Sequence, residues 1–309
     1  MSITADSVKQ LRERTGAGMM ECKRALVETQ GNLDAAAELM RKQGLAKADK
    51  KAARVAAEGV IAIEKSADGK SAAAIEVNCE TDFVAREADF RAFAADVARL
   101  ALAARPADVA ALLALSLPNG ESVDERRRTL VAKIGENITV RRFSVLQATG
   151  HLGAYLHGTR IAAMVAIDGG TQQLAHDLAM HVAASNPAYL SAAEVPAEVL
   201  AKEREIEAEK TRNEGKAAEM IDKIVEGKLR KFTNSIALLG QPFVKDDKQT
   251  IEKLVKAAGA TIKRFERLEV GAGIEKKQDD FVGEVMAQVK AQVKAAAKDP
   301  ELDPSKPKH

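Results

Sequence analysis

The spacing of apolar residues changes at Gly59, and this change constrains the fold more than any other feature of the chain. Before it, apolar residues recur three and four positions apart, which is typical of one face of a helix. After it the period is two, as in a strand, and residues 60–64 and 70–79 flank Asp68-Gly69. This pair favours a tight hairpin turn because glycine tolerates positive φ. The sequence therefore predicts an α+β fold with an antiparallel sheet.

The second strand of this hairpin leads into a turn that contains a large aromatic residue, Phe83. Apolar and polar residues alternate over residues 74–79, so we expect one face of the strand to be buried and the other to face water. Thr81 or Asp82 can cap the next helix, because a short side-chain oxygen accepts a hydrogen bond from an unpaired backbone N–H. The turn is therefore predicted to be a strand-to-helix junction.

Phe83 has two interpretations. The next helix carries Phe90, Phe93, Val97 and Leu100 at spacings of three and four, and Phe83 lies roughly two helical turns before Phe90. An apolar stripe at helical spacing is usually core, so on the residues alone the simpler interpretation is that Phe83 begins this stripe. The alternative is an exposed aromatic residue with a function.

Residues 1–55 are expected to form a compact module of three short helices. Thr4 can cap the first helix, and the helices over residues 19–29 and 33–41 each follow a glycine-containing break. A basic stretch comes next, within residues 47–54. We expect it to be a solvated linker, with contact to RNA as the alternative.

Short internal matches indicate that the rest of the core is duplicated. Residues 96–106 align with 177–187, and residues 139–143 align with 261–265. We therefore expect two related half-domains, each a small antiparallel sheet with helices. Their predicted bounds are residues 56–147 for the first, and residues 148–195 together with 233–274 for the second.

Residues 196–232 interrupt the second half-domain. Ten of the fifteen residues from 202 to 216 are charged, which excludes a buried helix. A turn at residues 213–215, with apolar positions on both sides of it, predicts an antiparallel helical hairpin that protrudes into water. In this hairpin Val199 and Ile206 are expected to pack against an edge formed by Ile221, Ile224, Val225 and Leu229.

Residues 275–309 are expected to form a C-terminal helix and a tail. The helix begins near Asp279 and carries an apolar stripe, so it needs a surface to lie on. After Lys298 the chain contains three prolines and few apolar residues that could build a core, so we expect this segment to be disordered.

The composition favours a protein partner over nucleic acid. The chain has 47 basic and 45 acidic residues, no tryptophan and 3% aromatic residues, so it lacks the positive field and the stacking surfaces that nucleic-acid binding uses. Cys22 and Cys79 are far apart, with no CxxC motif, which points to a reducing compartment. There is no apolar run of about 18 residues and no apolar leader, so we expect a cytoplasmic protein without membrane contact.

The sequence does not indicate catalysis, a metal or a cofactor. Residues 69–71, Gly-Lys-Ser, resemble the end of a phosphate-binding loop, but Glu64 stands where that loop needs glycine. His176 and His181 are five residues apart, which places them on different parts of a helix and matches no metal motif. We therefore expect no enzyme activity, no metal or cofactor, and no direct binding of nucleotide.

Several longer motifs occur in an order and at distances that closely resemble one known family, bacterial translation elongation factor Ts. The similarity covers almost the whole chain, as far as the region of Phe281. The motifs lie at residues 11–23, 81–86, 155–161, 180–185, 231–233 and 241–244.

The resemblance implies that the chain exchanges guanine nucleotide on elongation factor Tu. It implies that Phe83 is a wedge beside the partner's magnesium region and that Asp82 perturbs the polar network around that metal. Thr81 and Val84 would set the turn. The further partner-binding residues that the resemblance implies are Arg12, Met19, Met20 and His157; for the methionines, the alternative is that one of them fills the core of the helical module.

The resemblance also implies features of the fold. It predicts a ubiquitin-associated-like fold for residues 1–55, and a coiled coil at residues 196–232 through which two copies of the chain associate. The competing hypothesis is a helical adaptor or a ribosome-associated RNA-binding factor that uses the first module and the basic stretch. The nearly balanced charge argues against it.

Overall fold

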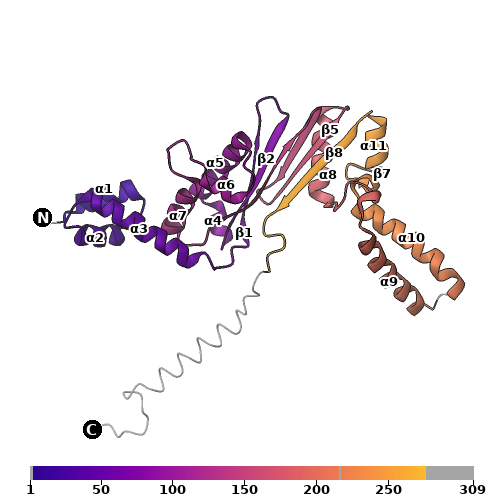
Figure 1. The fold of residues 1–309 in the computed structure, drawn as a ribbon, viewed down its shortest axis with the longest axis horizontal. Helices are drawn as coiled ribbons and strands as arrows, with labels where there is room; N and C mark the ends of the chain where they lie inside the picture. The colour runs from indigo at the N-terminus through magenta and orange to yellow at the C-terminus, as the bar shows by residue number, and fades with distance from the viewer. Residues whose placement is uncertain (1–2, 216, 276–309) are drawn as a thin grey trace, which may run out of the picture. The chain divides into compact units, whose positions relative to one another are not determined.

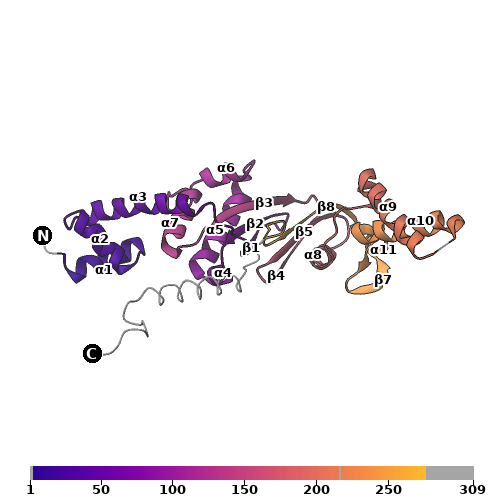
Figure 2. The same ribbon diagram turned by 90° about the horizontal axis from the view of Figure 1, so that it is seen from below.

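The structure is a computed structural model that describes residues 3–215 and 217–275 (Figures 1 and 2). These residues contain both helices and antiparallel sheets, so the fold is α+β, as predicted. The C-terminal helix and tail expected over residues 275–309 lie, beyond Glu275, outside the described residues.

The N-terminal part consists of three helices, α1 (Ala5–Thr15), α2 (Met19–Glu28) and α3 (Leu33–Lys51). Thr4 caps α1, as predicted, with its hydroxyl accepting a hydrogen bond from the Ser7 N–H at 3.1 Å. Gly16 ends the helix with φ at 66°, a conformation that suits glycine. The helices enclose a small core that includes the fully buried Leu11 and Leu26.

The first sheet has three antiparallel strands in the order β1-β2-β3: β1 (Glu58–Lys65), β2 (Ser71–Cys79) and β3 (Thr139–Gln147). Gly69 makes the predicted hairpin turn with φ at 67°. Helix α5 (Ala88–Ala104) packs on one face of this sheet, where its residues Phe90 and Phe93 are buried. The helices between β2 and β3 are α4 (Asp82–Arg86), α5 (Ala88–Ala104), α6 (Val109–Ala114) and α7 (Val123–Ile134).

Helix α3 extends past its predicted end at Arg41 to Lys51 and contacts α7. The linker expected within residues 47–54 is therefore wrong for residues 47–51, which are helical. The added turns are rich in alanine and lysine, which are strong helix formers. Gly44 allows the two helices to approach closely, since a Cβ at this position would lie 3.1 Å from the Cβ of Ala132. Ala48 is buried in the core of the first sheet and its helices. Helix α3 therefore joins the N-terminal helices to that core directly.

The second sheet has the order β4-β5-β8 and is covered on one face by a helix, α8. The elements that build it are β4 (His151–His157), β5 (Ile161–Asp168), α8 (Gln172–Ser185) and β8 (Thr261–Glu269). Between α8 and β8 come η1 (Ala192–Glu194), α9 (Ala197–Asn213), α10 (Ala218–Ile236), η2 (Leu238–Gly240), β6 (Pro242–Phe243), β7 (Asp246–Thr250) and α11 (Ile251–Ala257).

The two sheets share irregular details. The middle strand of each has a register shift, between Glu76 and Val77 in β2 and between Ala166 and Ile167 in β5. The helices α5 and α8 both end at a residue other than glycine in the left-handed region, Arg105 (φ 49°) and Asn186 (φ 45°). Arg105 and Asn186 are paired by the internal sequence match.

The two sheets pack face to face, so the layers are helix, sheet, sheet, helix. The water-facing side expected for β2 is wrong, because the second sheet covers it and all nine residues of β2 are buried. The apolar residues at this interface include Ile61, Ala74 and Leu146 from the first sheet and Leu152, Met164 and Leu268 from the second.

Glu76 of β2 lies at the sheet–sheet interface, with its side chain fully buried. Its carboxylate accepts hydrogen bonds from Arg141 Nη1 at 3.0 Å and from Arg142 Nε at 2.6 Å. The Asn78 side-chain amide, at 3.0 Å, and the Gly271 N–H, at 2.7 Å, donate to the same carboxylate. Burial by itself raises the pKa of Glu76, but these hydrogen bonds outweigh it and the pKa lies below the ordinary value.

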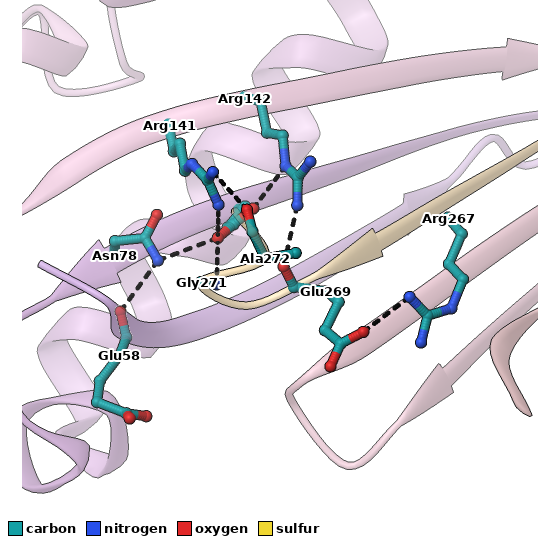
Figure 3. Close-up of polar contacts among 9 residues, drawn as sticks. Glu58, Asn78, Arg141, Arg142, Arg267, Glu269, Gly271 and Ala272 are labelled. Carbon is teal, nitrogen blue, oxygen red and sulfur yellow. Dashed lines mark hydrogen bonds and ion pairs between the residues drawn. The ribbon is translucent and has the colours of Figure 1, made fainter. Parts of the chain in front are cut away.

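The two arginines also bond the main chain at the end of β8, as Figure 3 shows. Arg141 Nη2 donates to the Ala272 carbonyl at 2.6 Å, and Arg142 Nη2 donates to the Glu269 carbonyl at 2.9 Å. Residues far apart in the sequence therefore meet at one buried carboxylate, which ties the last strand of the second sheet to the first sheet.

Helices α9 and α10 pack against each other as the predicted hairpin (Figure 1). Lys228 of α10 bridges to Glu207 of α9 at 3.0 Å. Val225 and Leu229 are buried as expected, but Ile206 is exposed, so its predicted packing is wrong. Thr211 takes an inward position instead, with its hydroxyl donating to the Glu207 carbonyl. No helix within the described residues has the length and hydrophobicity of a membrane span.

Replacing Glu76 with alanine should lower the free energy of unfolding by about 3 kcal/mol, because both arginines and the Gly271 N–H lose a buried partner. The urea midpoint at neutral pH measures this change. As a control, Glu266→Ala removes a carboxylate that bonds the exposed Arg264, and should cost less than about 1 kcal/mol. Equal midpoints for the two variants would contradict the role given to Glu76.

Candidate functional site

The turn after β2 presents an aromatic side chain to solvent. Thr81 is the N-cap of α4, with its hydroxyl accepting a hydrogen bond from the Val84 N–H at 3.4 Å. Val84 and Ala85 are buried and anchor the short helix, whereas Phe83 is 74% exposed. The interpretation that Phe83 begins a core stripe is therefore wrong.

The physical reason is a break between α4 and α5. Glu87 adopts an extended conformation (φ −62°, ψ 136°) between the two helices. Phe83 and Phe90 are consequently on different helices, and their spacing of seven does not place them on one face. Phe90 is buried in the core, whereas Phe83 lies outside it and is exposed.

Asp82 stands beside Phe83 in the first turn of α4 and is half-exposed. Its carboxylate accepts a hydrogen bond from Arg86 Nη2 at 2.6 Å. Exposed pairs of this kind are weak, so a partner can displace the arginine at small cost. The turn therefore offers a protein partner an apolar ring and an acidic group side by side.

Glu136 was not among the residues singled out from the sequence, and it holds this turn from the loop before β3, which lies at the same end of the sheet. Its carboxylate accepts hydrogen bonds from the N–H groups of Glu80 and Thr81, at 3.0 and 2.9 Å, and from the Thr81 hydroxyl at 2.6 Å. The only local signal for it is its place after a helix-ending glycine and before a strand. That signal does not say which distant groups it bonds.

The N-terminal helices expose the residues expected to bind a partner. Met19 and Met20, in the first turn of α2, are 55% and 65% exposed, so neither fills the core of the helices. Arg12 of α1 is exposed as well. Methionine is flexible and polarisable, which suits adaptable apolar contact.

His157 lies at the end of β4 and is exposed. Its Nδ1 is 3.0 Å from the Tyr155 hydroxyl. The adjoining turn is held to the first sheet, because the Ile61 N–H donates to the Thr159 carbonyl at 2.8 Å. Phe83, the methionines and His157 therefore belong to three different elements, as separate points of contact would require.

One cavity of about 520 Å³ lies between the N-terminal helices and α7. It is lined by both basic and acidic side chains, and it includes none of the site residues predicted from the sequence. Within the described residues, no group of histidine, cysteine and acidic side chains could hold a metal ion.

Cys79 is buried at the end of β2, directly before the turn. Burial raises the pKa of its thiol to about 12, and the charges of Glu136 and Glu58 act in the same direction. The thiol stays protonated at neutral pH, so it has a packing role and does not act as a nucleophile.

His181 of α8 is fully buried and bonds the segment after α10. Its Nδ1 accepts a hydrogen bond from the Val244 N–H at 3.2 Å, so Nε2 carries the proton and donates to Gln241 Oε1 at 3.0 Å. Burial lowers the pKa of His181, and the bond to Gln241 offsets this only in part. The ring is therefore neutral in the folded protein at neutral pH.

Comparison with known proteins decides the family. A family model described as elongation factor TS matches residues 80–272, which include the Phe83 turn and both sheets' last strands. The chain belongs to the elongation factor Ts family. Its relatives named "Elongation factor Ts" include those of Alkalilimnicola ehrlichii (58% identical), Methylococcus capsulatus (57%) and Hydrogenovibrio crunogenus (53%), with 93% of this chain and 98–99% of each relative covered.

The buried His181 predicts a pH dependence of stability in this family member. Its folded pKa is lowered below the unfolded value of about 6.5, so its contribution to stability is complete above that pH and is lost as the pH falls below it. The free energy of unfolding should therefore fall more steeply between about pH 7 and 5 in the native protein than in His181→Asn, which cannot titrate there. Parallel pH profiles would contradict a buried, neutral His181.

Proposed function

We propose that the protein is a guanine nucleotide exchange factor for elongation factor Tu in translation elongation, and that Phe83 is its wedge. The family membership supports the partner and the activity. The observation that carries the wedge is the exposure of Phe83 on a short helix whose neighbouring residues are buried. A large aromatic side chain held outside the core is available for a partner's surface.

Exchange of this kind is a coupling between two binding events. A factor that binds the empty carrier better than the loaded one weakens nucleotide binding by the same factor, by thermodynamic linkage. The carrier holds its nucleotide through magnesium and through a loop around the phosphates, so a group that displaces either one releases the ligand. No covalent bond is made or broken, and the activity is therefore not that of an enzyme in the usual sense.

Within this proposal the turn residues have distinct roles. Phe83 intrudes near the partner's magnesium and phosphate site, and Asp82 competes for the polar groups around that metal. Thr81 and Val84 shape the turn, one by capping α4 and the other by anchoring it in the core. Together they stabilise the nucleotide-free state of the partner.

The other contacts provide affinity. Arg12, Met19 and Met20 dock the N-terminal helices, and His157 provides a further contact from the β4–β5 turn. The protein itself binds no nucleotide, cofactor or nucleic acid, and works in the cytoplasm.

We propose the following organisation for this function: a ubiquitin-associated-like docking module at residues 1–55, a duplicated core, and a hairpin at residues 196–232 through which two copies associate. The matching register shifts and helix ends of the two sheets support the duplication.

Replacing Phe83 with alanine should slow catalysed GDP release roughly tenfold or more, because a central aromatic contact is lost. Its free energy of unfolding should change by no more than about 0.5 kcal/mol, since the side chain is exposed. Stopped-flow release of a fluorescent GDP analogue, together with urea denaturation, measures both quantities.

Phe93→Ala is the matched control, because the same truncation at a buried position should cost about 3–5 kcal/mol of stability. The wedge proposal fails if Phe83→Ala exchanges nucleotide at the native rate, or if it destabilises the protein as much as Phe93→Ala does.

Replacing Met20 with alanine should weaken binding to elongation factor Tu by about tenfold, and should leave the maximal rate of GDP release unchanged. This pattern separates a docking contact from the wedge. Met220→Ala, in the hairpin, removes a methionine of similar exposure (56%) and should leave the affinity unaltered. If both methionine variants bind equally well, Met20 has no docking role.

A further inference from the structure

The loop between α7 and β3 meets the turn that carries Phe83 through bonds in both directions. Glu136 accepts hydrogen bonds from the N–H groups of Glu80 and Thr81 and from the Thr81 hydroxyl, at 2.6–3.0 Å. In return, the Glu80 carboxylate accepts a hydrogen bond from the Asn137 N–H at 2.6 Å. Bonds to a carboxylate are among the strongest that a neutral donor makes.

The Thr81 hydroxyl connects Glu136 to α4. It donates its proton to Glu136, and its oxygen accepts the hydrogen bond from the Val84 N–H. Because the proton is committed to Glu136, a lone pair is left directed at the first turn of the helix. Glu136 therefore orients the N-cap of the helix that carries Phe83.

Helix α4 depends on such an anchor. It has five residues, which is too short for a helix to be stable by itself. Phe83 is largely exposed and gains little packing that could fix its position. The direction of its side chain consequently follows from the turn at Thr81 and from the buried Val84 and Ala85.

The second sheet shows that a strand-to-helix turn does not need this carboxylate. Thr171 caps α8 with a similar extended backbone and accepts a hydrogen bond from the Leu174 N–H at 3.1 Å. Extended upstream without a gap, the offset of the internal match between residues 139–143 and 261–265 places Ala258 opposite Glu136 and Gly259 opposite Asn137, and neither of these has a side-chain acceptor. Glu136 is thus found in the half of the core that carries Phe83.

The same loop also holds the chain that leaves the N-terminal helices. The Lys51 ammonium donates to the Gly135 carbonyl, and the Asn137 side-chain amide donates to the Arg54 carbonyl at 2.7 Å. Residues 135–137 therefore bond the end of α3 on one side and the Phe83 turn on the other.

We propose that Glu136 is a positioning residue for nucleotide exchange, which acts by fixing the Thr81 turn so that Phe83 meets the partner in one orientation. This inference rests on the proposed function of Phe83. Glu136 itself touches neither the nucleotide nor the magnesium; it acts through Thr81.

The test is the variant Glu136→Gln, which replaces one acceptor oxygen by an NH₂ group that faces other donors. The maximal rate of GDP release from elongation factor Tu, at saturating concentration of the variant, should fall about tenfold, because misplacement of a positioned group by about 1 Å can cost up to about a hundredfold in rate and the buried Val84 and Ala85 still hold α4. The concentration for half-maximal rate should change less than about twofold, since the docking contacts remain. The control is Glu266→Gln, which removes a half-buried carboxylate that bonds Arg264, and this variant should exchange nucleotide as the native protein does.

A double variant shows whether Glu136 acts through Phe83. If it does, Phe83→Ala with Glu136→Gln is no slower than Phe83→Ala alone, because the wedge is already absent. The proposal is overturned if the rate reductions of the two single variants multiply in the double variant. If Phe83→Ala slows exchange and Glu136→Gln does not, the role of Glu136 fails and the wedge stands; if Phe83→Ala has no effect, the proposed function fails first.

A spectroscopic readout separates positioning from a loss of stability. The chain has no tryptophan, so Phe83→Trp introduces a single indole, at the turn, which can be excited separately from the two tyrosines. Adding Glu136→Gln should increase the amplitude of fast local depolarisation of this indole at a temperature where both proteins are folded by circular dichroism. Should Glu136→Gln not fold, Glu136→Asp, which retracts the carboxylate by one methylene, is measured in the same way. An unchanged anisotropy decay would overturn the proposal.

Discussion

The burial of Glu76 between the two sheets is the constraint on which the arrangement of the core depends. A carboxylate in this place is stable only because two arginines, an amide and a backbone N–H all donate to it. The arginines also bond the main chain at the end of β8, so the last strand of the second sheet has one fixed position against the first sheet. An apolar interface alone would tolerate small displacements, whereas these directional bonds do not.

The same strand that buries Glu76 leads directly to the turn that carries Phe83. Strand β2 is covered on both faces, and its end at Cys79 is therefore fixed in space. Glu80 and Thr81 are bonded to Glu136 and Asn137, which precede β3 in the same sheet. The rigid core thus extends to the base of α4, and Phe83 is the first large side chain beyond it. A wedge needs this support, because a mobile aromatic side chain would lose entropy on insertion.

Local features of the fold could be predicted from the sequence, because short-range interactions determine them. The hairpin at Gly69 and a helix cap at Thr81 or Asp82 follow from residue type and spacing, and the structure has the cap at Thr81. The burial of Glu76, the outward position of Phe83 and the bonds of Glu136 could not be predicted in this way. They depend on a second sheet covering β2, on the extended backbone at Glu87, and on contacts between residues more than fifty positions apart.

Photocrosslinking from position 83 is the most direct test of the wedge. A photoreactive phenylalanine analogue would replace Phe83, with the same analogue at Met220 in the hairpin as a control, and each protein would be irradiated in complex with nucleotide-free elongation factor Tu. The account predicts crosslinks from position 83 to the partner's segments around the magnesium and the phosphates, and none to those segments from position 220. Crosslinks from position 83 that map only to other surfaces of the partner would contradict it.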